Sequence, residues 1–142
     1  MAIHPLQASP QVAETAFAFL AQQGFTLQER WISGDESFKD GWRLTFAGPM
    51  GEVVLQYMEL QFEVNFMREG IAVSYLEIDR ELFNGRGGFH GDMFPIQKIE
   101  GAVNRIAEDI REHYSLVFSG DEGVWKRLAR VKAERARARR LS

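Results

Sequence analysis

Apolar and polar positions alternate most regularly in the middle of the chain, from Val53 to Leu76, and this pattern predicts β-structure. Val53, Leu55 and Tyr57 fall on one face of an extended strand, because side chains alternate with a period of two. The other face holds Met58, Leu60, Phe62, Val64 and Phe66. A regular strand cannot bury both sets on one side, so we predict a bulge or a bend near Tyr57–Met58. Residues 57–60 lack turn-forming residues, which disfavours a tight hairpin there.

Gly-rich and polar breaks mark the other strands. A turn at Arg68-Glu69-Gly70 predicts a hairpin in which strand 71–78 pairs antiparallel with strand 61–67. Alternating apolar positions predict two earlier strands at about 25–31 and 42–46. Because the connections are short, we predict an antiparallel meander of four to five strands.

Helical patterns flank this sheet. Ser9-Pro10 is typical of a helix start and Gly24 of a helix end, which predicts a helix over 10–23. Apolar residues at intervals of three and four predict a second helix over 95–115. They are Ile96, Ile99, Val103, Ile106, Ile110 and Tyr114. A last helix begins near Asp121, so the predicted fold is α+β with the order α-β-β-β-β-α-α and helices over one sheet face.

Charge divides the chain unevenly. The 142 residues predict one domain, and their net charge is −3. Eight of the 17 basic residues and one of the 20 acidic ones lie in 124–142, which gives +7 there and −10 in the 123 residues before. We therefore divide the chain into a single α+β domain over 1–132 and a basic C-terminal tail over 133–142.

Composition excludes several kinds of chemistry. The chain has no cysteine, so disulfides, cysteine-ligated zinc and thiol catalysis are ruled out. The first ten residues lack the basic and apolar regions of a signal peptide, and no apolar run reaches the roughly 18–20 residues that span a bilayer. We therefore expect a cytoplasmic protein that does not contact membranes.

The glycine-rich segment 84–92 is the first candidate site. Its glycines would let backbone approach a ligand, Arg86 could pair with phosphate or carboxylate, and His90 with Asp92 could exchange protons. It matches neither the Walker A nor the dinucleotide-binding pattern. A connecting loop that contacts a partner is the alternative interpretation, and it is the one we favour.

An acidic row is the second candidate. Glu59, Gln61, Glu63 and Asn65 alternate along one predicted strand and therefore line one face. The two carboxylates would lie roughly 13 Å apart at ~3.3 Å per residue. That separation exceeds the spacing of a glycosidase pair. A polar, solvent-facing side of the sheet is sufficient to explain the row, and an acidic recognition surface is the more specific interpretation.

No pattern predicts a metal or a cofactor. The three histidines, His4, His90 and His113, fall at a terminus, in a loop and on a helix, without metal-binding spacing. The basic tail could contact nucleic-acid phosphates, but the acidic body would repel them, so nucleic acid is the disfavoured partner. Docking of the tail on acidic surface of the same chain, or of a second copy, is one alternative. A solvated, partly frayed terminus is the interpretation we favour.

The chain resembles small cytoplasmic bacterial orphan proteins, some of which are immunity proteins for polymorphic toxins. The resemblance rests on the helix-then-meander order, the acidic body and the closing segment HYSLVFSGDEGVWKRL, at 113–128. It implies a partner protein and transfers no functional residue. The basic tail departs from this pattern.

These observations favour a non-enzymatic protein-binding module. In the immunity-type version, the acidic strand face and the glycine-rich loop block the cationic active site of a toxin. A homodimer is a further form of protein partner. The alternative is a small-molecule-binding domain or enzyme built around Arg86, His90 and Asp92.

Overall fold

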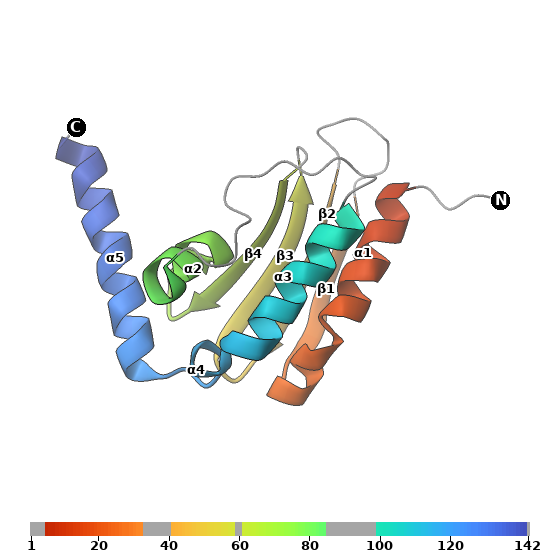
Figure 1. Cartoon of the computed structure of the whole chain (residues 1–142), viewed down its shortest axis with the longest axis horizontal. Coiled ribbons are helices and arrows are strands. Elements are labelled where there is room, and N and C mark those ends of the chain that lie inside the picture. Colours follow the sequence, from red (N-terminus) through yellow and green to blue (C-terminus); the bar gives the residue numbers. More distant parts are fainter. Residues whose placement is uncertain (1–4, 33–40, 59–60, 85–98, 142) are drawn as a thin grey trace.

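A computed structural model describes residues 5–32, 41–58, 61–84 and 99–141 of the chain. One antiparallel sheet forms the centre, and helices lie across one of its faces and beside its last strand (Figure 1). The predicted α+β class and the meander are confirmed.

The five strands follow one another in space in the order in which they follow in the chain. They are β1 (Thr26–Ile32), β2 (Trp42–Gly48), β3 (Gly51–Met58), β4 (Gln61–Arg68) and β5 (Ile71–Ser74). Every neighbouring pair is antiparallel.

A hairpin, not a bulge or a bend, separates the two apolar registers, so our prediction near Tyr57–Met58 is wrong. β3 ends at Met58 and pairs there with Gln61, the first residue of β4. A two-residue connection pairs odd-numbered residues with even-numbered ones, so the buried series changes from odd to even positions. A single strand over the whole segment would also exceed the usual length of about 3–10 residues.

The pairing register aligns the buried side chains in rows across the sheet. One row joins Trp42, Tyr57 and Phe62. The next rows are Leu44–Leu55–Val64 and Phe46–Val53–Phe66–Val73. All of these residues are buried on the same face.

Two helices cover this apolar face. Helix α1 (Pro5–Ala16) continues into the 3-10 helix η1 (Ala18–Gln23), and α3 (Ile99–His113) lies beside α1 (Figure 1). The apolar stripe of α3 is buried, as predicted, at its described positions. Gly24 ends η1 with a left-handed backbone, φ 85°, which confirms the predicted helix end.

The predicted start of the first helix at Pro10 is wrong. The helix begins at Pro5, and Pro10 lies inside it. A proline at the first helical position sacrifices no hydrogen bond, and Pro5 fills that position here.

The predicted strand 71–78 is a strand for only half its length. β5 ends at Ser74, and helix α2 (Tyr75–Phe83) begins directly after it. The Ser74 hydroxyl accepts from the Glu77 N–H at 3.1 Å, and the Glu77 carboxylate accepts from the Ser74 N–H at 3.1 Å. This capping box, Ser-x-x-Glu, is a sequence signal for a helix start that our interpretation of the segment passed over.

The chain ends in a short helix, α4 (Ser115–Phe118), and a long one, α5 (Glu122–Leu141). Asp121 caps α5, since its carboxylate accepts from the Val124 N–H at 2.9 Å. Trp125 and Leu128 are buried, and α5 then runs unbroken through the residues of the basic tail. α5 lies beside α2, beyond the last strand of the sheet (Figure 1).

Gly51, the first residue of β3 after the β2–β3 turn, generates a stability prediction, because its φ is +144° and a Cβ there would overlap the Met67 carbonyl oxygen. We expect Gly51→Ala to lower the free energy of unfolding by about 1–3 kcal/mol. The matched control is Gly101→Ala, at an exposed position of α3 with open space around it. This change should raise stability by about 0.5–1 kcal/mol. Urea denaturation of both variants checks the pair, and equal effects would contradict the assigned turn.

Candidate functional site

The face of the sheet opposite α1 and α3 is the first candidate surface, and we call it the open face. Its described residues on the three central strands follow from the register and alternate with the buried rows. They are Arg43, Thr45 and Ala47 on β2, Glu52, Val54, Gln56 and Met58 on β3, and Gln61, Glu63, Asn65 and Met67 on β4. None of the described helices covers this face, and its side chains are exposed or half-buried.

The acidic row predicted from the sequence belongs to this open face in its described part. Gln61 and Glu63 are exposed, and Asn65 is half-buried. Glu59 lies outside the described residues. The three described side chains of the row therefore do not point into the core. A recognition surface requires this orientation.

The candidate site residues of the glycine-rich segment fall outside the described part of the chain. Arg86, His90 and Asp92 lie outside the described residues, so a ligand site built around them stays a prediction.

An aromatic side chain on β1 extends the open face, and our sequence interpretation missed it. Trp31 pairs with Arg43 in register, so both lie on this face. The Arg43 guanidinium sits 5.8 Å from the centre of the Trp31 ring and 3.0 Å from the Glu29 carboxylate. Trp31 nevertheless remains 40% exposed. Alternation had placed it on the same face as Phe25, but a register shift between Leu27 and Glu29 breaks the alternation.

The open face, with β1 and β5 included, has the area of a small protein–protein interface. Five strands at ~4.8 Å spacing and about seven residues at ~3.3 Å each give roughly 500 Å² of projected area. Protruding side chains add to this value. A standard interface takes about 800 Å² from each partner.

The second candidate surface is the contact between α5 and α2, where three basic side chains of α5 pair with acidic side chains of α2. Arg127 donates from Nε to the Glu81 carboxylate at 2.7 Å and from Nη2 to the Glu81 carbonyl oxygen at 2.7 Å. Lys132 and Arg135 both reach the Glu77 carboxylate, at 3.3 and 3.1 Å. The docking of the basic segment on acidic surface of its own chain, one of our alternatives, is therefore observed for these residues.

Glu77 joins the capping box to this contact. Partial burial, the largest single influence, would raise its pKa. The hydrogen bond from the Ser74 N–H and the charges of Lys132 and Arg135 together outweigh burial, so the pKa of Glu77 lies below its ordinary value. The carboxylate thus remains ionised at neutral pH between two cations.

A tyrosine cluster joins α2 to α3 and α4. Tyr75 donates to the Asp109 carboxylate at 2.7 Å, and Tyr114 is sandwiched between the rings of Tyr75 and Phe83, at 5.9 and 5.4 Å. Burial raises the pKa of both tyrosines well above the ordinary value, and nearby acidic groups raise it further. A catalytic tyrosine needs the opposite shift, so we interpret the cluster as a structural contact.

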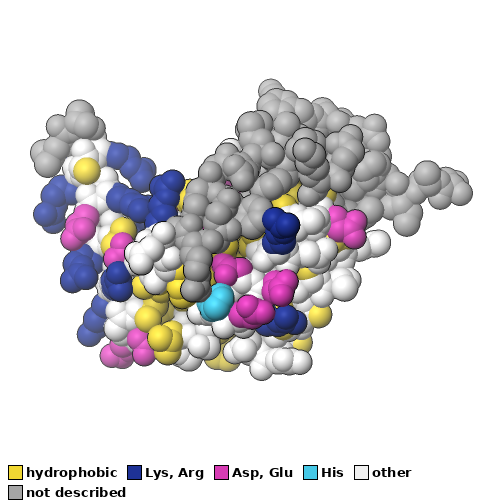
Figure 2. Space-filling model, viewed as in Figure 1, with side chains coloured by type: hydrophobic (Ala, Val, Ile, Leu, Met, Phe, Trp, Pro, Cys, Tyr) yellow, Lys and Arg dark blue, Asp and Glu magenta, His cyan; other side chains and the backbone are white. Residues whose placement is uncertain are grey.

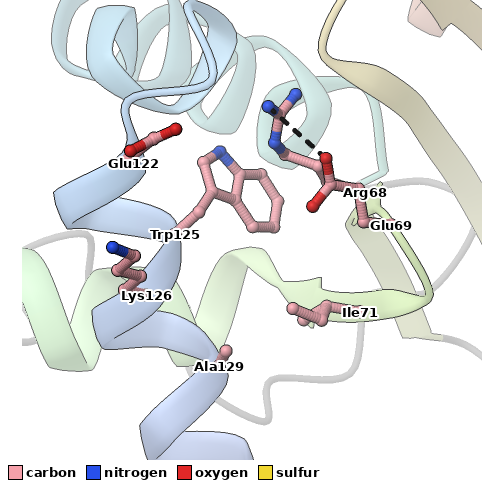
Figure 3. A pocket seen from close by; sticks show the side chains of 7 residues that line it. All are labelled: Arg68, Glu69, Ile71, Glu122, Trp125, Lys126 and Ala129. Atoms are coloured by element: carbon pink, nitrogen blue, oxygen red, sulfur yellow. Dashed lines mark ion pairs between the residues drawn. The ribbon is translucent and has the colours of Figure 1, made fainter.

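A small hollow lies between the β4–β5 turn and the start of α5 (Figure 3). Its volume is about 190 Å³, below the roughly 300 Å³ at which ligand pockets begin. Arg68 and Glu69 line it from the sheet, and Glu122 and Lys126 line it from α5 (Figure 3). Arg68 is already held by the Met50 carbonyl oxygen at 2.9 Å. Equal numbers of acidic and basic groups give the hollow no preference for a charged ligand.

A larger hollow, of about 420 Å³, lies between α1 and α3. Its walls are Thr15, Ala16, Asn104, Ala107, Glu108 and Arg111. Ligand pockets are lined mainly by aromatic and apolar side chains, and this one has no aromatic wall.

The described residues offer neither a metal site nor a membrane-spanning helix. Across the described ranges, no group of three or more His, Asp or Glu side chains could hold a metal ion. No helix among the described residues is both long enough and apolar enough to cross a bilayer.

Glu77 generates a pH prediction. Because its pKa is lowered in the folded state, its contribution to stability is full above its ordinary pKa and is lost as the pH falls through the lowered value. We expect Glu77→Gln to cost about 1 kcal/mol at pH 7, mainly through the cap, and to flatten stability below about pH 4.5. Glu134→Gln, at an exposed site of α5, is the control. Urea melts from pH 3 to 7 test this, and an unchanged acid slope in Glu77→Gln would contradict the assignment.

The two stacked tyrosines generate a second prediction. The buried Tyr114 hydroxyl has no hydrogen-bond partner among the described residues, whereas the Tyr75 hydroxyl has Asp109. We expect Tyr114→Phe to leave the free energy of unfolding unchanged or raise it, because an unsatisfied hydroxyl is removed. Tyr75→Phe should lower it by about 1–2 kcal/mol. Chemical denaturation of the two variants separates these effects, and a reversed order would contradict them.

Comparisons with known proteins identify no relative of this chain, so a functional proposal rests on the geometry described above. The chain matches no protein-family model, and neither the curated proteins nor the solved structures give a significant match.

Proposed function

We propose that this chain is a non-enzymatic protein-binding module that presents the open face of its sheet to a protein partner. The observation that carries the proposal is a broad sheet face without a described helix over it, with large apolar side chains exposed among acidic ones. An antiparallel sheet that packs helices on one face has its other face in contact with water until a partner covers it.

Exposed apolar side chains supply the affinity in this proposal. Trp31 and Met67 are 40% and 39% exposed. Val54 is half-buried in the row between them, and Met58 is half-buried in the row beyond Trp31. Trp and Met are enriched in protein interfaces, and Trp is among the residues that contribute most to binding. Trp31 is already oriented by Arg43, so its ordering on binding costs little entropy.

Charge supplies the orientation. The described open face has acidic side chains at Glu29, Glu52 and Glu63 and a single basic one, Arg43. Such a face attracts a cationic surface, speeds its association and disfavours acidic partners. The immunity-type version follows: the partner is a toxin whose cationic active site the acidic row blocks. A second copy of the chain is the less favoured partner, because two acidic faces repel each other.

A double variant of the open face tests the proposal. We expect Trp31→Ala/Glu63→Lys to weaken binding of the natural partner by 100-fold or more, on the order of 3 kcal/mol for an anchor and a charge. Leu116→Ala/Glu108→Lys is the matched control, since it also removes an exposed apolar side chain and reverses an exposed acid, but on the helical side.

The measurement has two steps. The partner is first recovered from the source lysate with the wild-type chain, and its affinity for each purified variant is then measured by calorimetry. Hydrogen exchange of the complex should show protection in β2, β3 and β4. Equal affinities for the two double variants, or protection confined to the helices, would refute the proposal.

A further inference from the structure

Seven of the eight basic residues of α5 form two groups with different surroundings. Arg127, Lys132 and Arg135 face α2 and are paired with Glu77 and Glu81. Lys126, Arg130, Arg137 and Arg140 are exposed. The first group holds the helix in place, and the second is turned to solvent.

Helix geometry places the second group on one stripe. At ~100° per residue, Lys126, Arg130, Arg137 and Arg140 fall within a sector of about 80°. The buried Leu128 lies on the other side of the helix, about 120–180° from each of these four residues. We call these four residues the outer stripe. Figure 2 shows Lys and Arg side chains gathered along α5, whereas acidic side chains gather over α3.

The length of the outer stripe suits a row of phosphates. Fourteen residues separate Lys126 from Arg140, which is about 21 Å along the helix. The phosphates of one duplex strand follow each other at about 3.4 Å along the helix axis, so a stripe of this length faces enough phosphates for each of its four cations to contact one. The flexible side chains of Arg and Lys accommodate the uneven spacing, and Arg binds phosphate with two parallel hydrogen bonds.

The acidic body does not cancel this surface. Its net charge is −10, which was our reason to disfavour nucleic acid as a partner. A helix with its side chains is about 10–12 Å thick, so Arg130, Arg137 and Arg140 stand off from the body by about that distance. Lys126 lies closer, at the hollow that Arg68 and Glu69 also line. The Debye length at physiological salt is about 8 Å, which screens most of the repulsion.

We propose that the outer stripe of α5 is a docking surface for the phosphate backbone of duplex nucleic acid, bound without regard to base sequence. The described side chains of the stripe include no aromatic residue on which bases of a single strand could stack. They include no large apolar anchor for a protein partner or a bilayer either. The stripe therefore offers four cations on a helix that other residues anchor, and these cations can contact the phosphate backbone of the nucleic acid.

Binding of this kind is weak and salt-dependent. Four phosphate contacts predict a slope of log K against log salt near −3.6, with Kd values in the range of about 10⁻⁴–10⁻⁶ M at physiological salt. Glu134 borders the stripe, at about 80° from Lys126, and reduces its net charge.

The test is fluorescence anisotropy of a labelled 20-base-pair DNA of arbitrary sequence with the full chain, between 25 and 200 mM salt. We expect Arg130→Gln/Arg137→Gln to weaken binding at least tenfold at low salt and to reduce the slope by about 1.8. The matched control is Arg105→Gln/Arg111→Gln, which removes the same charge from exposed positions of α3. It should change Kd less than twofold, and Glu134→Gln should tighten binding. Circular dichroism confirms that α5 stays helical in each variant.

Several outcomes would overturn the inference. They are no binding at 25 mM salt, a slope weaker than −1, equal losses in the two double variants, or tighter binding to single-stranded than to duplex DNA. Polyglutamate that displaces the duplex at equal charge concentration would assign the stripe to an acidic protein instead. Duplex RNA serves as a second probe, and binding comparable to that of DNA supports recognition of the backbone alone. None of these outcomes depends on the open face, so the proposed protein partner is tested separately.

Discussion

The register between the strands is the constraint on which the rest of the structure depends. It aligns Trp42 with Tyr57 and Phe62, and it repeats this alignment across three rows. A shift by one residue in any strand would move its apolar side chains to the opposite face. Because the rows are complete on one face, α1 and α3 can bury that face only. The open face carries the alternate positions of the same strands, and these are mostly polar.

The spacing of apolar residues predicted the helices and strands that bury only one of their faces. It failed where side-chain capping or tertiary packing determines where an element begins or ends. The meander and the buried stripe of α3 follow from spacing alone. The connection between β3 and β4 could not be predicted in this way, because residues 59–60 are not typical turn residues. Both a bulge and a hairpin would move the buried positions from odd-numbered to even-numbered residues. Strand length would have favoured the hairpin. The end of β5 was visible in the Ser74–Glu77 pair, which periodicity does not detect.

The candidate surfaces were predictable to different degrees. The alternation of Gln61, Glu63 and Asn65 was sufficient to place them on one face, because two-residue periodicity is geometric. Trp31 could not be assigned, since the register shift in β1 has no clear sequence signal. The charge of the basic segment was evident from composition. Its division into a docked group and the outer stripe required the position of α2, which only the tertiary structure gives.

The two edges of the sheet differ in a way that limits how the molecule associates. β5 has four residues and turns directly into a helix that α5 flanks, so it offers a short edge with little room for another strand. β1 is longer, but its register shift twists the edge away from a regular ladder. Short and irregular edges are how natural sheets avoid adding strands from neighbouring molecules. The two edges therefore offer little for a neighbouring copy to extend the sheet.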